Sequence, residues 1–193
     1  MDQVPENPPP DARTTVLLRV AKLVGGGRET LCVILDTSAR GLKVKLFAGL
    51  PHHEDLAIEL ANGDRHPVDC TGVAADHADL IFREPVLLDH LIAEARGGDK
   101  RHHIRLNIAL AGTLYSTNEP VPVMLRNISS QGAAFDCERW LAIDQAVRIE
   151  TAALPPLYAT VRWRDPPQYG IVFERIFPLE ELAKHCTGLP ALP

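Results

Sequence analysis

Two short clusters of polar residues in the second half of the chain are of the types that bind phosphates and purine bases. The first cluster holds Arg101 and Arg105, and the second holds Asn127, Ser129 and Gly132. An arginine guanidinium can form paired hydrogen bonds to a phosphate, pair with a guanine edge and stack on a base. Asn and Ser side chains donate and accept hydrogen bonds, and Gly lets another group approach the backbone closely.

Strand-like sequence separates the two clusters. Apolar residues alternate at Leu106, Ile108 and Leu110, a polar turn follows, and a second alternating run returns to Asn127. Taken alone, the arginine pair would be a solvated linker and the Asn-x-Ser-x-x-Gly run a polar turn. Their order, with the arginines before a strand and the second motif one hairpin later, favours a ligand site.

This arrangement resembles the PilZ domain family, whose members are small β-barrels that bind the bacterial second messenger cyclic di-GMP. The resemblance implies that the five residues of the two clusters bind this dinucleotide. Lys100 and His102 adjoin the arginines, and they either line the same site or lie on a solvated arm. The ligand carries two phosphates and two guanines, which are groups that arginine binds well.

The first half of the chain repeats the second half at a constant shift of 91 residues. Adding this number to positions 36, 38, 41, 58 and 80–82 gives positions 127, 129, 132, 149 and 171–173, which carry similar residues. A register held across such gaps indicates an internal repeat. It predicts two tandem domains that join near residues 97–98.

The first copy of the ligand motif is incomplete. Asp36, Ser38 and Gly41 are present, but with a one-residue gap Arg13 stands for Arg105, and the second arginine falls near Pro9. We therefore expect Asp36 and Ser38 to close a strand end in an Asx-type turn and not to bind the dinucleotide. An uncompensated Asp36 would also repel an anionic ligand.

We predict a mainly β protein made of two tandem PilZ-like six-stranded antiparallel β-barrels, each followed by a short helix. Residues 1–12 are rich in proline and should form a disordered tail. Residues 13–96 form the first, degenerate barrel with a helix from Pro85, and residues 97–193 form the second barrel with the ligand motifs and a helix from Pro178.

The bulk composition excludes several function classes. A net charge of −5 over 193 residues argues against binding to DNA or RNA. The amino terminus lacks a secretory signal, and no stretch has the apolar length of a membrane span, so we expect a cytoplasmic protein. None of the four cysteines forms a CxxC pair. We expect Cys32, Cys137 and Cys186 to be buried free thiols, with no metal site and no cofactor.

Two hypotheses for the function follow. The first is a non-enzymatic cyclic di-GMP receptor in which the ligand changes the arrangement of the two domains, or the binding of a downstream protein partner. The alternative is a PilZ-like protein interaction module that binds no nucleotide. No nucleophile elbow, P-loop or HExxH motif occurs in the sequence, so we expect no catalytic residues.

Overall fold

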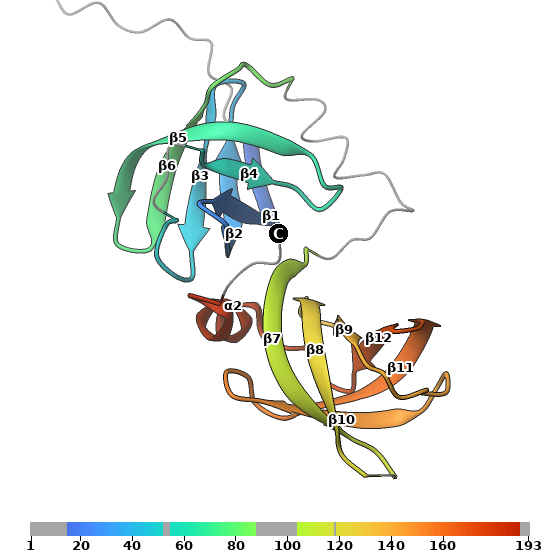
Figure 1. Ribbon diagram of the computed structural model, residues 1–193. Helices are drawn as coiled ribbons and strands as arrows, with labels where there is room; N and C mark the ends of the chain where they lie inside the picture. Colours follow the sequence, from blue (N-terminus) through green and yellow to red (C-terminus); the bar gives the residue numbers. More distant parts are fainter. Residues whose placement is uncertain (1–14, 52–54, 88–103, 118, 190–193) are drawn as a thin grey trace, which may run out of the picture.

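The computed structural model describes residues 15–51, 55–87, 104–117 and 119–189. These residues form two closed antiparallel barrels of six strands each, one above the other in Figure 1, and one helix. The first barrel contains β1 (Thr15–Gly25), β2 (Arg28–Thr37), β3 (Gly41–Leu46), β4 (Ala57–Glu59), β5 (Arg65–Ala74) and β6 (His77–Phe82). The second contains β7 (Leu106–Tyr115), β8 (Val121–Ile128), β9 (Gly132–Asp136), β10 (Ala146–Thr151), β11 (Leu157–Asp165) and β12 (Gln168–Phe173). The predicted fold class of two barrels is confirmed.

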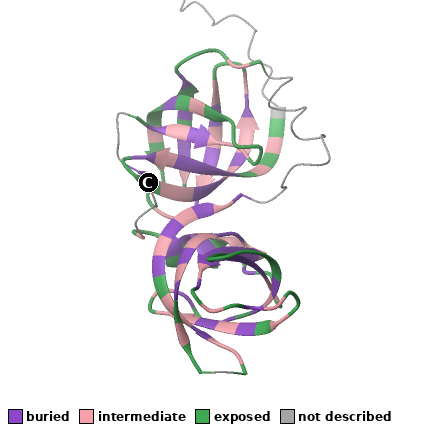
Figure 2. Ribbon diagram, turned by 45° about the vertical axis from the view of Figure 1, so that its right-hand side comes forward, coloured by how far each residue is buried: buried purple, intermediate pink, exposed green. Residues whose placement is uncertain are grey.

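Alternation of apolar and polar residues places each strand with one side toward a barrel interior. In β3, Leu42, Val44 and Leu46 are buried, whereas Lys43 and Lys45 face outward. Figure 2 shows buried residues alternating with more exposed ones along the strands in both barrels. Two hydrophobic clusters result, one for each barrel.

The helix α2 (Leu179–Cys186) follows the second barrel, as predicted. Acidic residues lie in its first turn and basic residues in its last turn, which suits the helix dipole. It buries Leu182, Ala183 and Cys186 in the core of the second barrel, and it also contacts β2 of the first barrel. The helix predicted from Pro85 falls mostly outside the described residues, and residues 85–87 are not helical. The predicted tail, residues 1–12, also lies outside them.

The internal repeat persists in the hydrogen bonds between strands. Ser38 N donates to Gly41 O at 2.8 Å, and Ser129 N donates to Gly132 O at the same distance. Phe82 N donates to Arg40 O in the first barrel, as Phe173 N donates to Gln131 O in the second. All these partners are related by the shift of 91.

The β-bulges also recur at equivalent positions in the two barrels. The pairing of β1 with β2 is irregular between Val16 and Arg19, and that of β7 with β8 between Asn107 and Leu110. No residue has been gained or lost between the barrels over these strands. The one-residue gap that we assumed for the arginines falls at Arg13, which lies outside the described residues, so it stays a prediction.

The cysteines are free thiols, as expected, and three of them are buried. Burial raises the pKa of Cys32 to about 12 and that of Cys186 to about 12, and it also raises the pKa of Cys137. Cys70 is exposed. Within the described residues, no group of three or more His, Cys, Asp or Glu side chains is placed to hold a metal ion.

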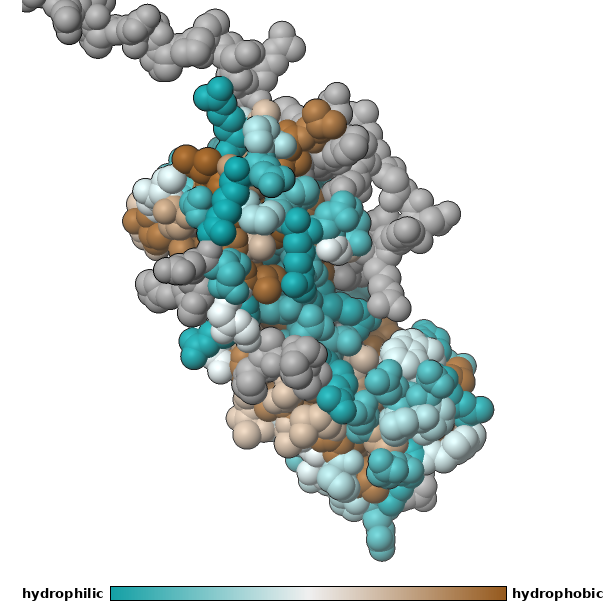
Figure 3. Space-filling model, turned by 45° about the horizontal axis from the view of Figure 1, so that its top comes forward, coloured by the Kyte–Doolittle hydropathy of each residue, from teal (hydrophilic) through white to brown (hydrophobic). Residues whose placement is uncertain are grey.

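The face of the molecule in Figure 3 is mostly polar, with apolar patches over the first barrel in its upper part. The most exposed large apolar residues of this barrel are Val16 and Leu18 on β1. No helix in the described part of the chain is long and apolar enough to cross a membrane.

Candidate functional site

Arg105 and Asn127 are brought together by the pairing of the first two strands of the second barrel. Arg105 directly precedes β7, and Asn127 lies near the end of β8, opposite Asn107. The Arg105 guanidinium donates a hydrogen bond from Nη1 to Asn127 Oδ1 at 2.7 Å. Both side chains are half-buried, so the arginine is held in position while part of it faces solvent.

Ser129 and Gly132 form the turn between β8 and β9. The Ser129 side chain is buried, and its Oγ donates to Gly132 O at 3.1 Å. A Cβ on Gly132 would lie only 2.1 Å from the backbone oxygen of Ile171. The glycine is therefore required for close approach of β12, and its contact with a ligand stays a prediction. Gly41 has the same role, since a Cβ there would lie 2.3 Å from Leu80 O.

A cavity of about 370 Å³ lies beside this turn. It is open to solvent along strands β9, β11 and β12. The described residues that line it include two arginines and no carboxylate: Arg105, Asn127, Ser129, Gln131, Gly132, Ala134, Arg162, Trp163, Gly170, Ile171 and Val172. Such a lining suits an anionic ligand with polar edges and flat faces.

Arg162 and Trp163 enter the cavity wall because β11 carries a bulge. Val161 pairs with Ile171 and Trp163 with Gly170, so Arg162 is the extra residue. The Trp163 indole lies over Gly170, where a Cβ would be 1.9 Å from its Nε1. The indole is still 43% exposed. It therefore offers a flat aromatic surface at the edge of the cavity.

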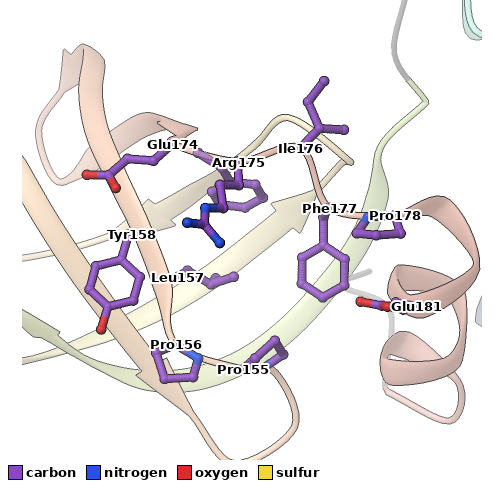
Figure 4. Close-up of a pocket in the computed structure, with 11 residues that line it drawn as sticks. Pro155, Pro156, Leu157, Tyr158, Glu174, Arg175, Ile176, Phe177, Pro178 and Glu181 are labelled. Carbon is purple, nitrogen blue, oxygen red and sulfur yellow. The ribbon is translucent and has the colours of Figure 1, made fainter.

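A larger cavity, of about 630 Å³, lies between the end of β12 and α2 (Figure 4). Pro155, Pro156, Phe177 and Pro178 line it, and its charged residues are Glu174, Arg175 and Glu181. A lining with two carboxylates and one guanidinium has a net negative charge, which repels an anionic ligand. The smaller cavity therefore matches the predicted chemistry, although the larger one has more room.

Residues 99–186 match the sequence model of the PilZ domain family. This segment contains the whole second barrel and α2. The second barrel is a PilZ domain. No curated protein matches the sequence.

Solved structures that match this chain include PlzA from Borreliella burgdorferi in complex with cyclic di-GMP. It is 14% identical, with 88% of this chain and 86% of that chain covered and a TM-score of 0.39. The motility inhibitor MotI/DgrA of Bacillus subtilis is 15% identical, with coverages of 88% and 94% and a TM-score of 0.37. YcgR from Escherichia coli in complex with cyclic di-GMP is 12% identical, with coverages of 86% and 80% and a TM-score of 0.37.

The cavity of the PilZ domain brings together four of the residues that the sequence singled out: Arg105, Asn127, Ser129 and Gly132. Lys100, Arg101 and His102 lie outside the described residues. In the first barrel, Ser38 Oγ accepts from Gly41 N at 3.3 Å, which closes a turn like that of Ser129.

Sequence reasoning missed Arg162, Trp163 and Gly170 as parts of the cavity wall. Arg162 and Trp163 lie at a bulge of β11, and a bulge cannot be recognised from the alternation of apolar residues in a sequence. The available signal was a large aromatic residue and a glycine on neighbouring predicted strands, because the glycine leaves room for the ring.

Proposed function

We propose that this protein is a non-enzymatic receptor for cyclic di-GMP and that the PilZ domain binds the ligand in the cavity beside Arg105. The observation that carries the proposal is the lining of this cavity, where two arginines, two amides and an indole meet and the nearby carboxylate of Asp144 pairs with Arg162 from outside the lining, at 2.9 Å. Phosphates and guanine edges suit the arginines, and a guanine face suits the ring of Trp163.

We propose that the site binds its ligand without turnover. The direct test is calorimetric titration of the full chain with cyclic di-GMP, followed by chromatography of the ligand. We expect saturable binding and intact ligand, whereas turnover would contradict the receptor proposal.

We further propose that the ligand changes the arrangement of the two barrels or the binding of a protein partner. The backbone oxygen of Arg105 accepts a hydrogen bond from Lys22 of the first barrel at 3.1 Å, and Asn107 contacts that barrel two residues later. A ligand held by Arg105 therefore acts at the point where the barrels meet. Small-angle scattering should show a changed profile at saturation, and identical profiles would contradict this part of the proposal.

A matched pair of substitutions tests which barrel binds. Asn127 and Asp36 occupy equivalent positions, but only Asn127 accepts a hydrogen bond from Arg105. Asn127→Ala should weaken binding by about 1 kcal/mol, roughly fivefold, since a hydrogen bond to a charged group is lost. Asp36→Ala should leave the dissociation constant unchanged. Equal losses in the two variants by calorimetry would show that the first barrel also binds.

The indole of Trp163 gives a second prediction. Stacking of a base on an aromatic side chain contributes about 1–3 kcal/mol, and we expect about 1 kcal/mol here because the ring stays partly exposed. Trp163→Ala should therefore weaken binding about fivefold, whereas Trp163→Phe should retain most of the affinity. Trp140, which is 63% exposed and lies outside the cavity lining, is the matched control. If the wild type and Trp163→Ala bind with equal affinity, the indole ring does not stack on the ligand.

The larger cavity favours a second candidate function, a protein interaction surface. Its rim exposes Tyr158 and Ile176, which are 53% and 69% exposed, and prolines lie beside them in Figure 4. Aromatic and aliphatic side chains of this kind are typical centres of protein interfaces. Ile176→Glu should then reduce partner binding without changing the affinity for cyclic di-GMP.

A further inference from the structure

The two barrels meet at a buried polar cluster that belongs to the first barrel. Lys22 on β1 is only 3% exposed, and its ammonium group lies 3.0 Å from a carboxylate oxygen of Glu29 and 3.0 Å from one of Glu59. The ammonium group also donates a hydrogen bond to the backbone oxygen of Arg105, at 3.1 Å. Three oxygen atoms therefore surround the buried charge.

Glu29 also binds the PilZ domain, at the backbone of Asn107 in β7. Its Oε2 accepts a hydrogen bond from Asn107 N at 2.7 Å, and its Oε1 accepts one from Asn107 Nδ2 at 2.8 Å. The Glu29 side chain is 5% exposed. The first barrel thus fixes the backbone at Arg105 and at Asn107, on either side of the first residue of β7.

An apolar contact accompanies the polar one. Leu31 pairs with Lys22 across β1 and β2, is 1% exposed and packs into the hydrophobic cluster of the second barrel. Lys22 and Glu29 have no copies in the second barrel, because the shift of 91 carries them to Thr113 and Pro120, whereas Glu59 corresponds to Glu150. This face of the first barrel is therefore specialised for contact with the PilZ domain.

We propose that Lys22 and Glu29 are positioning residues for the ligand site. By fixing the backbone at residues 105–107 they hold the Arg105 guanidinium against Asn127, and the first barrel strengthens ligand binding without touching the ligand. This inference rests on the proposed function. The first barrel, which lacks the motif arginines, would thereby contribute to the ligand affinity of the PilZ domain. The reason is that an Arg105 side chain already held in place loses less freedom when the ligand binds.

Glu29→Gln keeps the size of the side chain and removes its charge. We expect cyclic di-GMP to bind about two- to tenfold more weakly, as for the loss of preorganisation of one long side chain. Hydrogen exchange at residues 105–107 should also become faster. The control is Asp79→Asn, which alters an exposed ion pair with Lys43 in the same barrel. The inference is overturned if Glu29→Gln binds like the wild type.

A double-mutant cycle separates positioning from general destabilisation. If Glu29 acts through Arg105, then Glu29→Gln should have no further effect on affinity in an Arg105→Ala chain, whereas its effect should multiply with that of Trp163→Ala. An undiminished effect in the Arg105→Ala chain would contradict the inference. If Glu29→Gln does not fold, Asn107→Ala serves instead, since it leaves the Lys22–Glu29 ion pair intact.

Failure of the proposed function has a different signature. A wild-type chain that binds no cyclic di-GMP would overturn both the proposed function and this role in affinity. Binding by the wild type that is unchanged in Glu29→Gln and Asn107→Ala would overturn only the role of the first barrel.

Discussion

Replacement of Arg105 by alanine is expected to weaken cyclic di-GMP binding by about five- to 150-fold, or roughly 1–3 kcal/mol. Its guanidinium is held by Asn127 at the cavity, and its loss removes paired hydrogen bonds to phosphate or guanine. Calorimetric titration of the full chain gives the dissociation constants. Arg101→Ala should act in the same direction.

The control for this prediction is Arg148→Ala. Arg148 lies on β10 in the same barrel, pairs with Glu150 at 2.9 Å and does not line the cavity. Thermal unfolding should show that the Arg105→Ala chain is folded, because this side chain is half-buried and contributes little to the core. If the Arg105→Ala chain binds with wild-type affinity, or if its second barrel is unfolded, the assignment of Arg105 as a ligand-binding residue is wrong.

Gly132→Ala is expected to destabilise the PilZ domain by about 3 kcal/mol. The added Cβ would lie 2.1 Å from Ile171 O and 3.2 Å from Ile171 C, and both atoms belong to the backbone of β12. The contact cannot be relieved by a side-chain rotation, so β9 and β12 must separate at the register where Gly132 faces Val172. Urea unfolding of the full chain measures the change.

Two other glycines provide controls. Gly41→Ala should destabilise the first barrel in the same way, since its Cβ would lie 2.3 Å from Leu80 O. Gly49→Ala should change the free energy of unfolding by less than about 0.5 kcal/mol, because a Cβ there meets no atom within 4 Å. A Gly132→Ala chain with wild-type stability and impaired binding would show that the glycine serves ligand approach after all.

The fold was predictable because the features that determine it are local or periodic. The alternation of apolar and polar residues in β3 predicted the strand and its buried side. The repeat at a shift of 91 residues predicted that the barrel occurs twice. The role of Gly132 was not predictable, since it depends on a contact with Ile171, which lies far along the chain. Burial of Lys22 was equally hidden, because a lysine in a strand usually faces solvent.

The candidate site was predictable where its residues lie close together in the sequence. Asn127, Ser129 and Gly132 belong to one turn, and Arg105 faces it across a single hairpin. Arg162 and Trp163 come from a distant strand, and an irregular pairing decides that both line the cavity. The contribution of Glu29 depends on how two domains dock, which no motif within one domain encodes.

Because the register between the barrels is unbroken, substitutions can be designed in one barrel from the residues of the other. A residue can be copied from the second barrel into the first by subtracting 91, with no loop to adjust. The cavity wall would need Trp in place of Gly72 and Gly in place of Asp79, since these positions match Trp163 and Gly170 and sit at the same bulge. Together with Asp36→Asn, such a graft would test how few substitutions the first barrel needs to bind the proposed ligand.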